Sequence, residues 1–314
     1  MAIKSQPLFR PSAGTVAGAR TAEVVAAPEV DPGDVDLQAR NVSFDWSAMR
    51  MHYFDDDVVA THLINVMHLF LPEGEEWFVR VFKEALPLIN DEKLRRDVVG
   101  FIGQEAMHAQ AHSGVHTFLT DKGLDPTRYV EQMEYIFRTA LGKRPTDTKN
   151  SLVERLSYIA AIEHLTAFLG HWVLTEKRLD SAAIDPTMLD LVRWHGAEEV
   201  EHRSVAFEVL QYFDTRRSRR IRTYIQVLPM VVIMWRRGVK FLMKNDPTID
   251  DSHREFRGRD FRAVTKRGLF PSMWDVVKVS SHYFSKSYHP SQEGSTAVAV
   301  AYLAASPAAR AASA

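Results

Sequence analysis

Two copies of the short motif Glu-x-x-His are the features of this chain whose residue types and spacing could do chemistry. One pairs Glu105 with His108 in FIGQEAMHAQAH, and the other pairs Glu199 with His202 in WHGAEEVEHRSVAF. On a helix, residues three apart lie on one face with Cβ atoms about 5 to 6 Å apart, so this carboxylate and this imidazole can converge on one metal ion. Each motif therefore predicts half of a metal site.

A helical bundle with two metal ions in its core takes one more glutamate from each of two other helices. Glu75 is the first, because its helical face carries the apolar Phe78 and Phe82, whereas the face of Glu76 carries Arg80. A buried carboxylate without a partner is costly, so a glutamate on such a face needs a metal or a cation.

Glu163 is the second expected glutamate, since its helical neighbours include Ala160, Ala167 and Gly170, which leave room near the carboxylate. A single Glu-x-x-His is most often a surface pair or a local hydrogen bond. Two of them, with both expected glutamates, favour the metal site. The predicted ligands are Glu75, Glu105, His108, Glu163, Glu199 and His202.

Neighbouring residues leave parts of the ligand set open. His195 lies four residues before Glu199 on the same face, and direct ligation and simple packing remain equal alternatives for it. His112 is expected to support the ligands from behind. Glu198 and Glu201 are expected to be exposed, although Glu198 competes with Glu199 for the ligand position and could support the site instead.

Composition narrows the chemistry. With no cysteine among 314 residues, thiolate zinc sites and iron–sulfur clusters are excluded. Imidazoles and carboxylates make an oxygen-rich site that suits two iron ions, with manganese or zinc as alternatives. The net charge of -1 gives no global case for nucleic-acid binding. No signal-peptide-like stretch or apolar run of transmembrane length is apparent, so we expect a cytoplasmic protein.

The elements that must position these residues are helices, because apolar residues recur at spacings of three and four with few alternating β-branched runs. We expect an all-α, ferritin-like four-helix bundle with extra helices. Residues 1–37 are predicted to be a disordered arm, 38–290 the helical domain, and 291–314 a flexible Ala/Ser-rich tail.

Turn and capping residues divide the domain. Pro72 and Gly74 precede the first predicted core helix, and a Ser151 and Glu154 capping box opens the third. Asp185 and Pro186 open the fourth. The predicted core helices cover residues 75–88, 91–120, 151–179 and those from 186 onward, with a crossover helix over 124–141.

Residues 216–244 have an apolar middle between basic ends. The main expectation is a core or dimer-interface helix broken near Pro229, so a homodimer is compatible with the sequence. A basic-flanked apolar helix can also lie on a membrane surface, and we expect peripheral membrane contact at most.

The chain resembles the bacterial family of predicted metal-dependent hydrolases within the ferritin-like superfamily. The resemblance rests on PEGEEWF, FIGQEAMHAQAH, AAIEHLTAFLG and WHGAEEVEHRSVAF and spans about residues 45 to 290. It implies that the family's metal positions fall on the six predicted ligands. A more distant similarity, to di-iron arylamine N-oxygenases, rests on the spacing His195, Glu199, His202.

We therefore expect a di-iron oxidoreductase, of oxygenase or oxidase type, that uses dioxygen to oxidise a small or hydrophobic organic substrate. A hydrolase with two metal ions and a metal-activated water is one alternative. An iron-binding or storage protein is another. The Gly-x-Gly-x-x-Gly turn of nucleotide-cofactor sites is lacking, so electrons are expected from an external donor.

Overall fold

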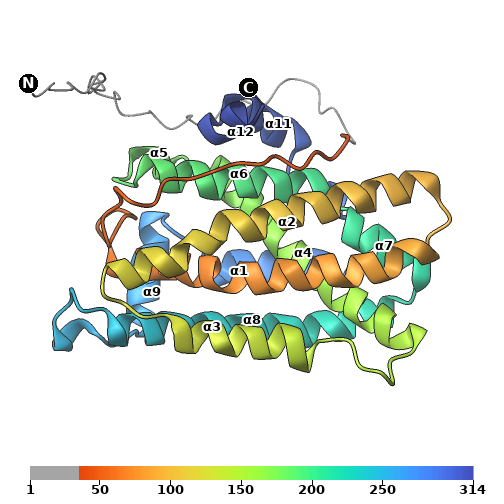
Figure 1. Cartoon of the computed structure of the whole chain (residues 1–314), viewed down its shortest axis with the longest axis horizontal. Helices are drawn as coiled ribbons and strands as arrows, with labels where there is room; N and C mark the ends of the chain where they lie inside the picture. The colour runs from red at the N-terminus through yellow and green to blue at the C-terminus, as the bar shows by residue number, and fades with distance from the viewer. Residues whose placement is uncertain (1–34, 314) are drawn as a thin grey trace, which may run out of the picture.

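The computed structural model describes residues 35–313, and within them the chain is helical without a β-strand. The all-α prediction is therefore confirmed. Four helices carry the predicted ligands: α1 (Val58–Ala85), α2 (Glu92–Asp121), α4 (Lys149–Thr175) and α6 (Pro186–His202). Helix α1 packs along α2, and α4 packs along α6, so the two pairs form a helical bundle (Figure 1).

Helix α1 begins much earlier than the sequence suggested. Asp57 caps it by accepting a hydrogen bond from the Ala60 amide (2.8 Å), and the helix runs through Pro72 to Ala85. A proline inside a helix removes one amide donor. Here residues on both sides of it, such as Leu69 and Trp77, remain buried in the core and hold the helix together.

The other core helices begin close to their predicted positions. Asp91 caps α2 through the Leu94 amide (2.7 Å), and Asp185 caps α6 with a proline in the first turn. The capping box of α4 differs from the predicted one, since Thr148 and Ser151 form it. Helix α4 also ends at Thr175, four residues before its predicted end.

Further helices complete the fold. The predicted crossover contains α3 and a following π-helical turn, and α8 runs through Pro229 without the break expected there. No helix within residues 35–313 has the length and apolar content needed to cross a bilayer. These helices are α3 (Thr127–Glu134), α5 (Arg178–Ser181), α7 (Val205–Phe213), α8 (Arg217–Asn245), α9 (Gly258–Arg267), α10 (Met273–Tyr283), α11 (Thr296–Ala305) and α12 (Pro307–Ala312).

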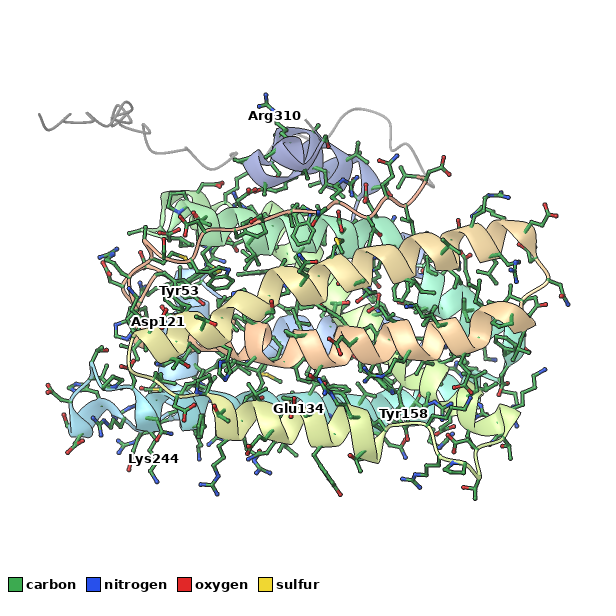
Figure 2. All side chains as sticks on the ribbon, in the orientation of Figure 1. Tyr53, Asp121, Glu134, Tyr158, Lys244 and Arg310 are labelled. Atoms are coloured by element: carbon green, nitrogen blue, oxygen red, sulfur yellow. The ribbon has the colours of Figure 1, made fainter. Side chains whose placement is uncertain are left out.

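The prediction of a flexible tail over 291–314 is wrong for most of that segment. Alanine is the best helix former, and the alanines and valines there form α11 and α12, which cover α6 (Figure 1). Asp190 on α6 accepts hydrogen bonds from the Tyr302 hydroxyl (2.9 Å) and the Ala308 amide (3.0 Å). Arg310 on α12 and Lys244 on α8 point outward at opposite edges of the molecule (Figure 2).

Most of the predicted N-terminal arm, residues 1–34, lies outside the described residues. From residue 35 an extended segment runs along α2 and α6 to the start of α1 (Figure 1). Glycines on α2 permit this contact: a Cβ at Gly100 would lie 2.5 Å from the Leu37 Cβ, and one at Gly114 would lie 2.5 Å from Trp46 Nε1. The segment therefore belongs to the folded domain.

Candidate metal centre

The structure brings the six predicted ligands and His195 together in the bundle core. They form two adjoining groups, in each of which the potential ligand atoms lie within 4.8 Å of one another. Glu75 comes from α1, the first Glu-x-x-His motif from α2, Glu163 from α4 and the second motif from α6. One group contains Glu105, Glu163 and His202, and the other contains Glu75, His108, His195 and Glu199.

In the first group, the His202 ring faces three carboxylates. Its Nε2 lies 3.3 Å from Glu105 Oε1, 3.2 Å from Glu163 Oε2 and 3.3 Å from Glu199 Oε2. All four side chains are buried. These atoms converge from three helices on one small volume.

In the second group, Glu199 Oε1 faces two imidazoles, at 2.8 Å from His195 Nε2 and 3.5 Å from His108 Nδ1. Glu75 Oε1 lies 3.7 Å from His195 Nε2, and the rings of His108 and His195 stack at 4.2 Å. Glu199 thus turns one oxygen toward each group. Glu76, the neighbour of Glu75 on α1, is exposed, as helical spacing predicted when it separated Glu75 from Glu76.

Many of these buried donor atoms make no hydrogen bond to any described residue, although a buried carboxylate without one is costly. They are both carboxylate oxygens of Glu75, Glu105 and Glu163, together with Glu199 Oε2, His108 Nδ1 and His202 Nε2. Oxygen and imidazole nitrogen atoms directed at one point are the donor set of a hard metal ion. The residues present therefore fit a pair of metal ions.

Electrostatics points in the same direction. Burial, together with the neighbouring charge of Glu199, raises the pKa of Glu163 to about 7 and that of Glu75 well above its ordinary range. Burial also raises the pKa of Glu105, assisted by Glu163. Burial would raise the pKa of Glu199 too, but His202 and His195 outweigh it and lower that pKa. So many crowded carboxylates need nearby positive charge to ionise together.

The outward ring nitrogens of two histidines are held by polar side chains. His108 Nε2 donates to Glu198 (3.0 Å), which also accepts from Arg40 (2.7 Å). His202 Nδ1 donates to Gln104 Oε1 (3.1 Å), whose amide donates to Glu201 (3.0 Å). Such partners fix the tautomer and direct the other ring nitrogen at the metal.

The expectation that Glu198 and Glu201 are exposed is wrong. Glu198 is fully buried, and the side chain of Glu201 is 3% exposed, because Arg40 bridges the two. Arg40 lies in the extended segment before α1 and Gln104 lies on α2, so neither carried a local signal in the sequence. The supporting position proposed for Glu198 agrees with its contact to His108.

His195 ends a chain of buried histidines. Its Nδ1 hydrogen-bonds His112 Nε2, and His112 Nδ1 lies 2.6 Å from His68 Nδ1. Burial lowers the pKa of His195 to about 4 and that of His68 to about 3, so the rings are neutral at pH 7. Like His108 and His202, His195 turns one nitrogen to the donor groups and the other to a fixed partner. The contact of His112 with His195 is compatible with the supporting role expected for it, and no local pattern marked His68.

A third group of similar residue types consists of His52, His62 and Asp246. It differs from the two donor groups because both oxygens of its carboxylate accept hydrogen bonds. His52 Nε2 and His62 Nε2 donate to the same oxygen of Asp246, at 2.8 and 3.0 Å. The other carboxylate oxygen accepts from the Thr248 amide (2.8 Å) and hydroxyl (2.6 Å). Both oxygens of the Asp246 carboxylate therefore have hydrogen-bond donors. These hydrogen bonds connect the segment before α1 to α1 and to the end of α8.

A cavity of about 90 Å³ reaches the second donor group from the α8 side. His195 and Glu199 line its inner end, and its other walls are almost entirely apolar, including Ile162, Leu165 and Trp235. The second donor group therefore borders a cavity suited to a small or apolar molecule.

The chain belongs to the family of predicted metal-dependent hydrolases, whose pattern it matches over residues 38–294. That description agrees with the hydrolytic alternative and does not support dioxygen chemistry. No curated protein and no solved structure matches the chain.

Proposed function

We propose that the chain is a ferritin-like enzyme whose two donor groups would each hold a metal ion, with one carboxylate oxygen of Glu199 directed at each group. The observation that carries this proposal is the concentration of buried donor atoms without hydrogen bonds at one place. Metal ions would offset the charge of the carboxylates that burial and mutual repulsion otherwise disfavour.

Iron is the metal we expect, with manganese and zinc as alternatives. A Glu from each of two helices plus a Glu-x-x-His from each of two others is the donor set of bundle proteins with two iron or two manganese ions. His195 would be an additional nitrogen ligand. Its inward Nε2 and its fixed outward Nδ1 support ligation over simple packing.

Oxidation of an organic substrate by dioxygen is the reaction that we place first. When bound in the reduced state, two irons would supply the electrons with which dioxygen reacts. The protein's part is to hold the ligands and admit an apolar substrate through the cavity beside His195 and Glu199 while limiting water. An external donor would return the electrons.

Metal-assisted hydrolysis is the second candidate, and the family description favours it. In that reaction the centre would polarise the scissile group and a water, and Glu163 or Glu75 would be placed to hold the water's proton. A hydrolase would also bind the polar atoms of its scissile group, yet the cavity walls near the centre are almost entirely apolar.

One pair of assays separates the two reactions. Metal-free protein is loaded with iron(II) without oxygen, mixed with dioxygen, and followed by oxygen consumption and visible absorption. Zinc-loaded protein is assayed in parallel against a panel of esters without a reductant. Oxygen consumption that is abolished in Glu163→Ala supports oxidation, whereas zinc-supported ester cleavage without oxygen consumption overturns it in favour of hydrolysis.

A further inference from the structure

A second, larger cavity of about 600 Å³ adjoins the cavity beside the metal centre. Ligand pockets commonly measure about 300 to 1,000 Å³. Its walls come from α4, α8, α9 and the start of α10, and they are mostly apolar. The two cavities share Leu165, Leu169, Val231, Trp235, Phe270 and Pro271 as lining residues.

Apolar residues line the junction between the cavities. The rings of Trp235 and Phe270 meet there at 5.6 Å, and Leu169 on α4 lines both sides. The two adjoining cavities, together called the channel here, present mostly apolar residues between the outer rim and His195 and Glu199. Its apolar lining suits a hydrocarbon chain.

The arginines of the lining belong to the outer cavity. Arg236 on α8 and Arg262 on α9 line the outer cavity, and both are exposed. Neither has a carboxylate within ion-pair distance in residues 35–313. The rim also carries exposed apolar side chains, Met273 (45% exposed) and Val232 (36% exposed).

We propose that this channel binds a single-chain amphiphile with an anionic head group. The head lies at Arg236 and Arg262, and the apolar chain passes Trp235 and Phe270 toward the metal centre. This inference rests on the proposed function and names its substrate class. Because a saturated chain has no bond that water can cleave, this orientation agrees with oxidation.

Binding to the metal-free protein tests the inference separately from catalysis. Calorimetry with decanoate, dodecanoate and tetradecanoate, each below its micelle concentration, should show affinity rising about fourfold for each added methylene. Tetradecyl sulfate should bind as tetradecanoate does, and tetradecyltrimethylammonium should bind more weakly. Affinity that is independent of chain length, or equal for the cationic probe, would overturn the proposal.

Two variants locate the chain and the head group. Leu169→Trp fills the junction, so affinity should stop rising at a shorter chain, whereas Val99→Trp, at an exposed site on α2, should bind as the wild type does. Arg236→Gln should weaken binding of the anion about two- to fivefold, as expected for an exposed ion pair. Arg237→Gln, at an exposed neighbour that does not line the cavity, is its control.

The outcomes separate this inference from the proposed function. Bound metal without chain-length-dependent binding contradicts the amphiphile alone. Chain binding by a protein that takes up no metal contradicts the proposed function alone. The protein could also sediment with anionic phospholipid vesicles. Sedimentation that added tetradecanoate does not reduce would show that the rim recognises a membrane surface, and would overturn the proposal.

Discussion

Each of three imidazoles in the bundle core presents one nitrogen to the donor groups and gives the other to a fixed partner. His108 hydrogen-bonds Glu198, His202 hydrogen-bonds Gln104, and His195 hydrogen-bonds His112. A ring held in this way has its tautomer and direction set before any metal arrives. The supporting residues should therefore matter almost as much as the ligands.

Replacement of Glu198 by Gln should lower metal affinity by about tenfold or more, because the His108 ring loses a charged acceptor. Competition with a chelator of known affinity measures this loss. Glu76→Gln, an exposed neighbour of Glu75, is the control and should not alter affinity. Equal metal affinity of the two variants would show that Glu198 does not support metal binding.

Replacement of His195 by Ala should weaken the binding of one ion and change the visible spectrum of the iron-loaded protein. The physical reason is the direction of its Nε2, at 2.8 Å from Glu199 Oε1. His164→Ala is a matched control, since His164 is buried and hydrogen-bonded to Tyr288 (2.7 Å) outside the donor groups. If His195→Ala keeps full iron content and an unchanged spectrum, that residue only packs.

At the scale of elements, the distance between α4 and α6 depends on two glycines. A Cβ at Gly170 would lie 2.4 Å from the Gly196 carbonyl oxygen, and one at Gly196 would lie 2.8 Å from the Gly170 Cα. Backbone atoms cannot yield as a side-chain end can. These glycines therefore set how closely Glu163 approaches Glu199.

Gly170→Ala should lower the free energy of unfolding by about 1 to 3 kcal/mol, as overpacking does, and should weaken metal binding by moving the two helices apart. Chemical denaturation and metal titration measure the two effects. A Cβ at Gly258 meets nothing within 4 Å, so Gly258→Ala should not destabilise the protein. An undiminished stability of Gly170→Ala would show that the helices can shift freely.

The hydrogen-bonded group at Asp246 predicts a dependence on pH. Burial would raise the pKa of Asp246, but hydrogen bonds from His52, His62 and Thr248 outweigh it and lower that pKa. The stabilisation is thus present above the ordinary value of about 3.9 and is lost as the pH falls from there toward the folded-state pKa. Asp246→Asn should cost about 1 to 3 kcal/mol at pH 7.

Unfolding measured from pH 7 to pH 3 tests this dependence. The difference in unfolding free energy between wild type and Asp246→Asn should shrink below about pH 4. There the unfolded wild-type chain binds a proton at Asp246, so the stabilisation from the ionised carboxylate is lost. Asp251→Asn, at an exposed aspartate, should show no difference at any pH. A constant difference for Asp246→Asn would mean that packing, and not charge, is what the substitution removes.

How far the sequence predicts these elements depends on the range of the signal. Helical spacing separated Glu75 from Glu76, because both stripes lie within three turns of one helix. The predicted start of α1 was wrong, because Pro72 suggested a helix boundary there. The helix continues through Pro72 because the residues on both sides of it are buried in the core. The Arg40 contact to Glu198 joins segments 158 residues apart, and no local pattern encodes it.

At the scale of the whole molecule, the candidate metal centre is buried among the helices. The extended segment before α1 and the helices α11 and α12 cover α6 from outside (Figure 1). The apolar cavities approach from the α8 side. Apart from that approach, the buried carboxylates are cut off from solvent. Their ionisation therefore depends on the folded structure that buries them. Metal binding should consequently stabilise the fold.

Metal removal should consequently lower the melting temperature. A ligand at about 100 times its dissociation constant stabilises the folded state by about 2.7 kcal/mol for each site. Thermal unfolding with added iron(II) or manganese(II), against chelator-treated protein, measures the shift. The shift should shrink in Glu163→Ala, and an equal shift in both proteins would place the stabilising ion elsewhere.

Elemental analysis of the purified protein, before and after anaerobic loading with iron(II), tests the central claim most directly. The donor groups predict about two ions per chain, falling in Glu105→Ala and Glu75→Ala, one variant from each group. A protein that binds no metal after loading, or whose metal content in both variants equals that of the wild type, would contradict a dinuclear centre.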